Sequence, residues 1–109
     1  GENIFMVKDN VFFTPRLKNQ ILPGITRDSV IKLVKDLGFT VFEKDLSLND
    51  LLSADELFFT GTAAEITPIN RLDDKIFDVG ELTSLVKDKF FDVVHGKNPV
   101  YKDWLVFVS

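Results

Sequence analysis

The chain has 109 residues, of which 45% are hydrophobic and 28% charged; this composition suits one small folded domain, or part of a larger one, and excludes a disordered chain. Seventeen acidic and thirteen basic residues give a net charge of −4, and the scattered basic residues form no cluster that would bind nucleic acid or an anionic membrane. There is no Cys and one His, which excludes disulfides and argues against a zinc site.

The first predicted element is a β-hairpin over residues 3–14. Two β-rich runs flank Lys8-Asp9-Asn10, and Asp and Asn tolerate the left-handed conformations that a tight turn requires. Pro15 ends the second strand, and a loop extends to Gly24.

A helix is predicted to follow, opening at Ile25-Thr26-Arg27-Asp28. Thr26 is a candidate N-cap, Asp28 suits the first turn, and Gly38 suits the position after the last turn. The apolar residues fall on one helical stripe: Val30, Ile31, Leu33, Val34 and Leu37.

The rest of the chain alternates short strands with helices. The predicted elements are a strand at 39–43 parallel to another strand, a short helix capped by Ser47 and ending near Ala54, a buried strand at 57–60, an extended piece at 66–69, a turn at Asp73-Asp74, a helix at 81–95 closed by Gly96, and an extended tail at 101–108. We therefore expect residues 1–109 to form a single α+β or mixed α/β domain.

The first segment that could bind a ligand is residues 22–28. A helix N-terminus exposes unpaired N–H groups and the positive end of the helix dipole, so it binds anions. Gly24 allows close approach of a ligand, and a phosphate would fit over Ile25 and Thr26. The alternative, which spacing alone leaves open, is an ordinary capped helix that binds nothing.

The second such segment is residues 60–65, Thr-Gly-Thr-Ala-Ala-Glu. Small residues directly after a buried strand form a turn whose N–H groups can hold a carboxylate or phosphate. A plain connection between two strands is the alternative. Two such segments in one short acidic chain strengthen the ligand-binding interpretation.

Other candidates are weaker. His95 is placed in the last turn of a helix, where capping or solvent exposure is the simpler role. Asp73 and Asp74 are expected to form a solvated turn, and Glu65 to be exposed or capping. No Ser-His-Asp, Walker or GxGxxG pattern is present, and no Lys lies in an apolar run that would lower its pKa.

Read together, the two segments resemble the fold-type IV pyridoxal-phosphate enzymes, most closely the branched-chain amino-acid aminotransferases. The matching strings cover nearly the whole chain in the family's order: Gly1-Glu2-Asn3-Ile4-Phe5, Thr14-Pro15, residues 21–28 (Ile-Leu-Pro-Gly-Ile-Thr-Arg-Asp), Leu37-Gly38, Ala54-Asp55-Glu56, residues 58–69 (Phe-Phe-Thr-Gly-Thr-Ala-Ala-Glu-Ile-Thr-Pro-Ile) and Trp104-Leu105. The two longest strings are specific.

The resemblance implies a fold, a cofactor and residue roles. The fold is the larger C-terminal domain, a pseudo-barrel with flanking helices. Ile25 and Thr26 would bind the phosphate of pyridoxal 5'-phosphate through backbone amides and the Thr hydroxyl, and Thr62 would add its hydroxyl. The Thr62 and Ala63 amides would face the substrate carboxylate.

The resemblance also implies what this chain lacks. The family's Schiff-base lysine, its glutamate on the pyridine nitrogen and its phosphate-binding arginine map before Gly1, so no catalytic residue is expected here. Residues 79–82 lack the family's Gly-Pro-rich stretch. The chain starts directly in a β-rich run and has eleven Phe, so we interpret it as a piece of a longer protein. The resemblance implies that this protein is a cytoplasmic enzyme that forms dimers or larger assemblies. By itself it should not transaminate.

Three functions remain open. The first is transfer of an amino group between branched-chain amino acids and 2-oxoglutarate. The second keeps the fold but acts as a D-amino-acid aminotransferase or an aminodeoxychorismate lyase; residues 63–68 favour the branched-chain type. The third is a non-catalytic domain that binds a phosphate ligand or a partner. A substrate panel and the upstream reading frame would separate them.

Overall fold

A computed structural model of the chain describes residues 3–16, 25–61, 65–78 and 80–94. Its elements are β1 (Asn3–Lys8), β2 (Val11–Thr14), α1 (Ile25–Asp36), β3 (Thr40–Glu43), α2 (Leu48–Leu52), β4 (Glu56–Thr60), β5 (Ile66–Pro68), β6 (Arg71–Leu72), β7 (Lys75–Ile76) and α3 (Glu81–Val94). Five strands form one sheet in the order β3-β2-β1-β4-β5, and β6 and β7 form a separate hairpin. The predicted mixed α/β class is confirmed.

The hairpin of β1 and β2 forms as predicted. Lys8 pairs with Val11, so the turn consists of Asp9 and Asn10, whose φ angles are 52° and 64°. Two consecutive left-handed residues match the right-handed twist of the flanking strands. This turn sets the register that brings Met6 opposite Phe13.

Helix α1 connects two parallel neighbours, β2 and β3, as predicted for a strand that follows a helix. The helix ends on Gly38, which has a φ of 95°. The Gly38 N–H donates to the Lys35 carbonyl and the Phe39 N–H to the Val34 carbonyl, which is a Schellman motif. The prediction of Thr26 as N-cap is wrong, because the helix already begins at Ile25 and Thr26 lies inside the first turn.

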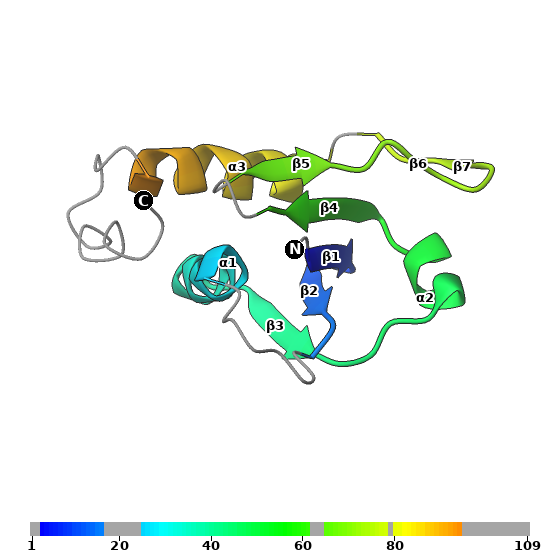
Figure 1. Ribbon diagram of the computed structural model, residues 1–109, viewed down its shortest axis with the longest axis horizontal. Coiled ribbons are helices and arrows are strands. Elements are labelled where there is room, and N and C mark those ends of the chain that lie inside the picture. Colours follow the sequence, from blue (N-terminus) through cyan, green and yellow to red (C-terminus); the bar gives the residue numbers. More distant parts are fainter. Residues whose placement is uncertain (1–2, 17–24, 62–64, 79, 95–109) are drawn as a thin grey trace.

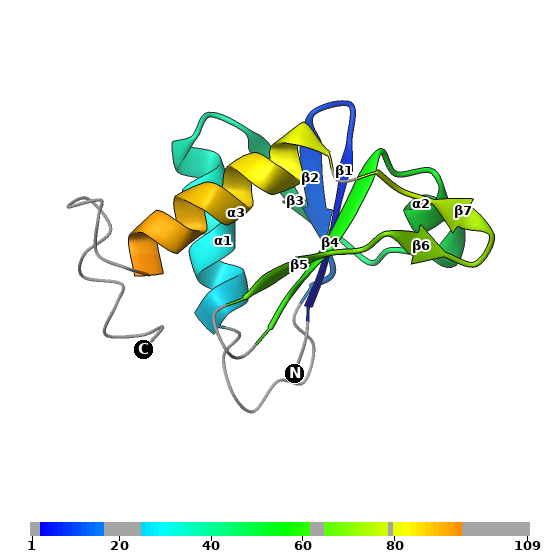
Figure 2. The same ribbon diagram turned by 90° about the horizontal axis from the view of Figure 1, so that it is seen from above.

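The sheet separates two hydrophobic clusters. Helices α1 and α3 lie on one face and α2 and the β6–β7 hairpin on the other (Figures 1 and 2). The rings of Phe5, Phe12 and Phe58 are fully buried under α1 and α3, with Phe5 stacked on Phe58 at a centroid distance of 5.1 Å. Met6 and Leu57 point to the smaller cluster on the opposite face, because successive side chains of a strand alternate between faces.

The short helix α2 begins with a local capping arrangement. Ser47 and Asp50 form the predicted capping box: the Asp50 N–H donates to the Ser47 hydroxyl and the Ser47 N–H to the Asp50 carboxylate. These bonds favour the ionised carboxylate, and the pKa of Asp50 is accordingly lowered, with the backbone bond from Ser47 as the largest cause.

Helix α3 is capped from another element. Gly80, just before it, accepts the first helical bond from the Ser84 N–H but has no side chain with which to cap. The buried Glu56 of β4 supplies the acceptor instead, taking hydrogen bonds from the Thr83 N–H at 2.7 Å and the Leu82 N–H at 3.4 Å. A carboxylate at this position also interacts favourably with the helix dipole.

Several expectations concern residues outside the described ranges. These are the loop of residues 17–24, the helix end at His95 and Gly96, and the tail at 101–108. Among the helices that the described ranges contain, none has the length and apolar character needed to cross a lipid bilayer.

Candidate functional site

The topology brings several strand ends to one edge of the sheet. Thr60, the last residue of β4, pairs with Asn3 at the start of β1 and with Ile66 at the start of β5. On the other side, β2 and β3 end together, with Thr14 beside Glu43. Because β2 runs antiparallel to β1, all these ends lie at the same edge.

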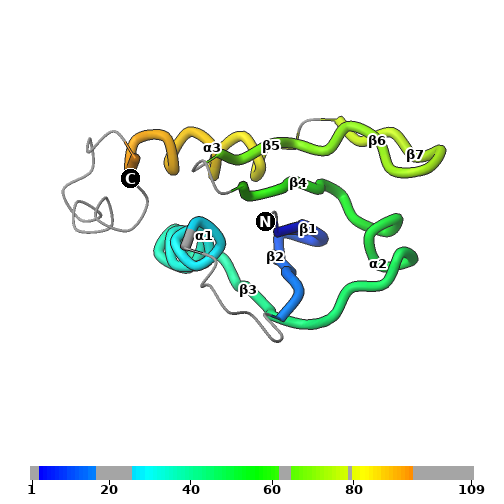
Figure 3. Tube along the Cα trace, viewed as in Figure 1, coloured from blue at the N-terminus to red at the C-terminus, as the bar shows by residue number. Residues whose placement is uncertain are grey.

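Helix α1 begins at this edge. In the chain it connects β2 to β3, which are parallel neighbours, and it runs back along one face of the sheet. Its N-terminus therefore lies beside the carboxyl ends of both strands (the tube of Figure 3 follows this crossover). Ile25 opens the helix, and Thr26 follows in its first turn with a buried side chain. The first amides of a helix have no partner within the helix and attract an anion.

The connection between β4 and β5 lies at the same edge. The Gly61 N–H donates to the Glu65 carbonyl at 3.0 Å, which closes a short loop. Among the described residues, its two chain neighbours aside, no heavy atom lies within 4 Å of the place where a Cβ on Gly61 would stand. Thr62 and Ala63 lie outside the described residues; Glu65 is exposed, as expected.

The described residues next to the two predicted anion-binding segments therefore lie at one edge of the sheet. They are Ile25 and Thr26 for the first segment, and Thr60, Gly61 and Glu65 for the second. Figure 2 shows α1 starting at the end of the molecule where β4 stops and β5 begins. The arrangement is the one that the anion-binding hypothesis requires, since loops on opposite sides would have ruled it out. Thr26 is the one predicted site residue whose side chain the structure describes.

Two buried threonines at this edge serve the backbone instead. The Thr14 hydroxyl donates to the Ile4 carbonyl at 2.8 Å, and the Thr60 hydroxyl to the Asn3 carbonyl at 3.5 Å. Both side chains are almost completely buried. They hold the ends of the sheet together and are not free to bind a ligand.

Arg27 is a residue of this edge that the sequence interpretation missed. Its guanidinium is 2% exposed and donates to the Pro15 carbonyl at 2.9 Å, to Glu43 Oε1 at 2.6 Å and to Asp28 Oδ1 at 3.0 Å. The hydrogen bond from Arg27 is the largest cause that lowers the pKa of the Glu43 carboxyl. The sequence did contain one indication: Arg27 is a cation in the first turn of a predicted helix, where the helix dipole disfavours positive charge unless the residue has another role.

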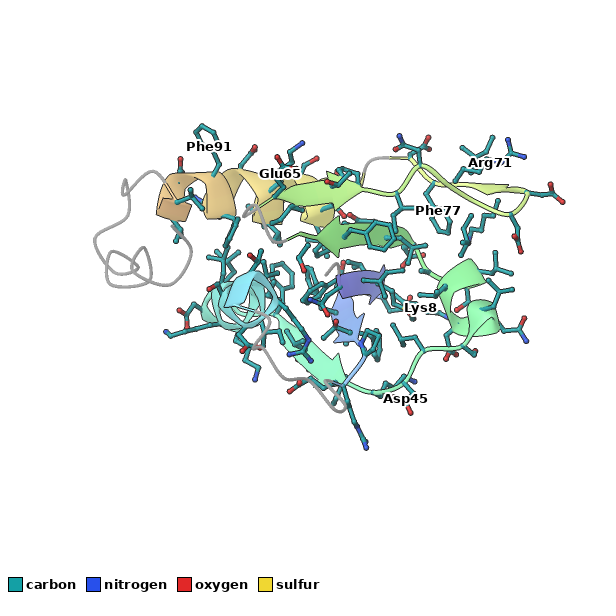
Figure 4. The ribbon with its side chains drawn as sticks, viewed as in Figure 1. Lys8, Asp45, Glu65, Arg71, Phe77 and Phe91 are labelled. Carbon is teal, nitrogen blue, oxygen red and sulfur yellow. The ribbon has the colours of Figure 1, made fainter. Side chains whose placement is uncertain are left out.

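The weaker candidates do not gather into a site. Asp73, with a φ of 51°, and Asp74 form the exposed turn of the β6–β7 hairpin, as predicted. The Arg71 side chain, on the same hairpin (Figure 4), donates to the Asp73 carbonyl. Within the described ranges, no group of three or more His, Cys, Asp or Glu could hold a metal ion. His95 lies outside those ranges.

Comparison with protein families agrees with this geometry. The model described as "Amino-transferase class IV" matches residues 1–72, which contain both segments of the candidate site. The sequence is 52% identical over 96 residues to a putative branched-chain-amino-acid aminotransferase of Methanocaldococcus jannaschii, covering 85% of this chain and 33% of that protein. It is 46% identical over 110 residues to the branched-chain-amino-acid aminotransferase of Escherichia coli K12, covering 96% and 35%.

Solved structures give the same result. The branched-chain aminotransferase of Thermoproteus uzoniensis with norvaline superimposes with a TM-score of 0.88 at 44% identity, covering 95% of this chain and 35% of that one. An aminotransferase from Brucella abortus bound to the cofactor PLP has a TM-score of 0.80 at 36% identity, covering 86% and 34%. The chain thus spans about a third of the length of these relatives, and the resemblance seen in the sequence is confirmed.

Proposed function

Because the chain belongs to the class IV aminotransferases, we propose that the protein containing it transfers an amino group between branched-chain amino acids (leucine, isoleucine and valine) and 2-oxoglutarate, with pyridoxal 5'-phosphate as cofactor. The observation that carries this proposal is the 46% identity along 96% of the chain with the Escherichia coli enzyme named for that activity. Relatives at 40–52% identity have the same name.

The family resemblance suggests which residues would bind the cofactor. The amides of Ile25 and Thr26 and the Thr26 hydroxyl would bind the phosphate, together with the Thr62 hydroxyl. The Thr62 and Ala63 amides would bind the substrate carboxylate. The described neighbours are compatible with this assignment, since Thr26 is buried in the first turn of α1 and no described atom beyond its chain neighbours lies within 4 Å of the Cβ position of Gly61. Pyridoxal phosphate, when bound, supplies an electron sink for chemistry at the amino acid's α-carbon.

This chain contributes binding and orientation to the proposed reaction, and the catalytic lysine comes from another part of the protein. Residues 1–109 would belong to one domain, the larger cofactor-binding one. A cytoplasmic location and assembly into dimers or larger oligomers are part of the same proposal. The 109 residues alone are expected to have no transaminase activity.

The proposal has an alternative within the same fold. A D-amino-acid aminotransferase would require the carboxylate-binding amides near Thr62 to receive the opposite enantiomer, and an aminodeoxychorismate lyase would release an aromatic amine. Branched-chain activity is favoured because relatives at 46–52% identity are named for it.

The test is a substrate panel on the protein that contains this chain. It is purified with pyridoxal 5'-phosphate and assayed for glutamate formation from leucine, valine, isoleucine and D-alanine with 2-oxoglutarate, and for release of p-aminobenzoate from aminodeoxychorismate. We expect turnover with the three branched-chain L-amino acids. Turnover with D-alanine or aminodeoxychorismate alone would select the alternative, and binding of pyridoxal 5'-phosphate without turnover of any substrate would leave a non-catalytic domain.

A further inference from the structure

The buried guanidinium of Arg27 joins three segments at the edge of the sheet where the cofactor phosphate is proposed to bind. Pro15 follows β2, Glu43 ends β3, and Asp28 belongs to the first turn of α1; all three accept a hydrogen bond from the same side chain. The contacts come from both terminal nitrogens, so the planar fork fixes direction as well as distance.

This arrangement does not serve helix stability. A cation in the first turn is opposed by the positive end of the helix dipole, and a buried guanidinium loses its hydration. Two carboxylates, Asp28 and Glu43, offset these costs. A well-packed apolar side chain could stabilise such a junction equally well, so what the guanidinium adds is a fixed orientation of the helix start relative to the two strands.

We propose that Arg27 is a positioning residue for the phosphate site: its contacts with Pro15 and Glu43 hold the first turn of α1 so that the Ile25 and Thr26 amides and the Thr26 hydroxyl face the bound phosphate. This inference rests on the proposed function. Thr26 directly precedes Arg27 in the first turn, so a change in the direction of that turn moves the Thr26 hydroxyl with it.

The experiment compares two ligands that differ only in the phosphate. Dissociation constants of pyridoxal 5'-phosphate and of pyridoxal are measured on the apo form of the protein that contains this chain, for the unmodified protein and for Arg27→Met. In metal sites, loss of a residue that orients the ligands costs about 10–100-fold in affinity, and we take this range as the guide for a residue that orients phosphate-binding groups. We expect a loss of this size for pyridoxal 5'-phosphate, and less than about threefold for pyridoxal because the phosphate interaction is absent.

Two further variants keep the test decisive if Arg27→Met folds poorly. Glu43→Gln removes a charge from one contact and should weaken pyridoxal 5'-phosphate binding by a smaller factor, again without a matching effect on pyridoxal. Arg71→Met is the matched control: the same substitution at an exposed side chain on the β6–β7 hairpin, away from α1 (Figure 4), should leave both affinities unchanged.

The outcomes separate this inference from the proposed function. If Arg27→Met and Glu43→Gln weaken both ligands equally, or neither, Arg27 is a structural residue and the inference is overturned while the proposed function stands. If the unmodified protein itself does not bind pyridoxal 5'-phosphate, the proposed function fails first and the inference fails with it.

Discussion

The carboxylate of Glu56 in β4 fills the space in which a side chain on Gly80 would stand. A Cβ at Gly80 would lie 1.9 Å from Glu56 Cδ and 2.1 Å from Oε1, far inside van der Waals contact. The same carboxylate caps α3. Glycine at this position therefore allows a residue of the sheet to reach the helix N-terminus.

Gly80→Ala should destabilise the protein, because Glu56 must leave the N–H groups of Leu82 and Thr83. Loss of a helix cap costs about 1–2 kcal/mol, which chemical denaturation would detect as a lower midpoint. Gly61→Ala is the matched control, since no atom of the described residues beyond its chain neighbours lies within 4 Å of its Cβ position. Equal midpoints for the two variants would contradict this account of Gly80.

Phe58→Ala should be among the most damaging single changes to the fold. Its ring is completely buried and contacts Phe5 and Phe12 at centroid distances of 5.1 and 6.3 Å. Truncation of such a ring costs about 3–5 kcal/mol. Phe42→Ala removes the same atoms from a ring that is 53% exposed and should cost about 1 kcal/mol or less. Denaturant midpoints of the two variants provide the comparison.

Two threonine variants should separate stability from cofactor affinity. Thr26→Val removes the hydroxyl proposed to bind phosphate, and a hydrogen bond to a charged group is worth about 1.5–3 kcal/mol, so the affinity for pyridoxal 5'-phosphate should fall about tenfold or more. Thr14→Val instead removes the donor to the part-buried Ile4 carbonyl and should cost about 0.5–1.5 kcal/mol of stability. Fluorescence titration measures the affinity of both variants, and thermal melts measure their stability. A larger affinity loss in Thr14→Val than in Thr26→Val would contradict this assignment.

The ion pair of Arg27 and Glu43 should make stability depend on pH. The pKa of Glu43 is lowered below its ordinary value of 4.5, first by the hydrogen bond from Arg27, so its contribution is present above that value and is lost as the pH falls through the folded-state pKa. Glu43 is 49% exposed, which limits the contribution to about 0.2–1 kcal/mol.

Glu43→Gln should accordingly lower the denaturation midpoint at pH 7. The difference should begin to shrink as the pH falls below about 4.3, where the unfolded carboxyl takes up a proton, and should vanish once the pH is below the lowered folded-state pKa. Urea melts of both proteins across this range measure the effect. A difference that stays constant down to about pH 3, well below the unfolded carboxyl's pKa, would show that the charge of Glu43 is irrelevant.

Elements set by neighbouring residues could be predicted from the sequence. The Asp9-Asn10 turn, the end of α1 at Gly38 and the Ser47 capping box each depend on residues close together in the chain. The assignment of Thr26 as N-cap failed because the helix begins at Ile25, which places the N-cap before Ile25; a preference for Thr at N-caps does not fix a helix boundary to within one or two residues.

Long-range polar contacts could not be predicted in this way. The Arg27 guanidinium reaches Glu43, 16 positions away, and the Glu56 carboxylate reaches Thr83, 27 positions away. Neither partner is marked by spacing or periodicity; only the packed sheet brings them together. The shared edge of the two anion-binding segments likewise depends on the strand order, since it requires β1 to lie between β2 and β4.

That central strand divides the five-stranded sheet into two blocks of strands. On one side lie β2 and β3, with α1 against β3; on the other lie β4 and β5, with α3 against β4. In the described part of the chain, the backbone ladders that join the blocks run through residues 3–8 alone. The two segments of the candidate phosphate site adjoin different blocks, so a bound phosphate would add a link between them beyond the first strand and the core that α1 and α3 share.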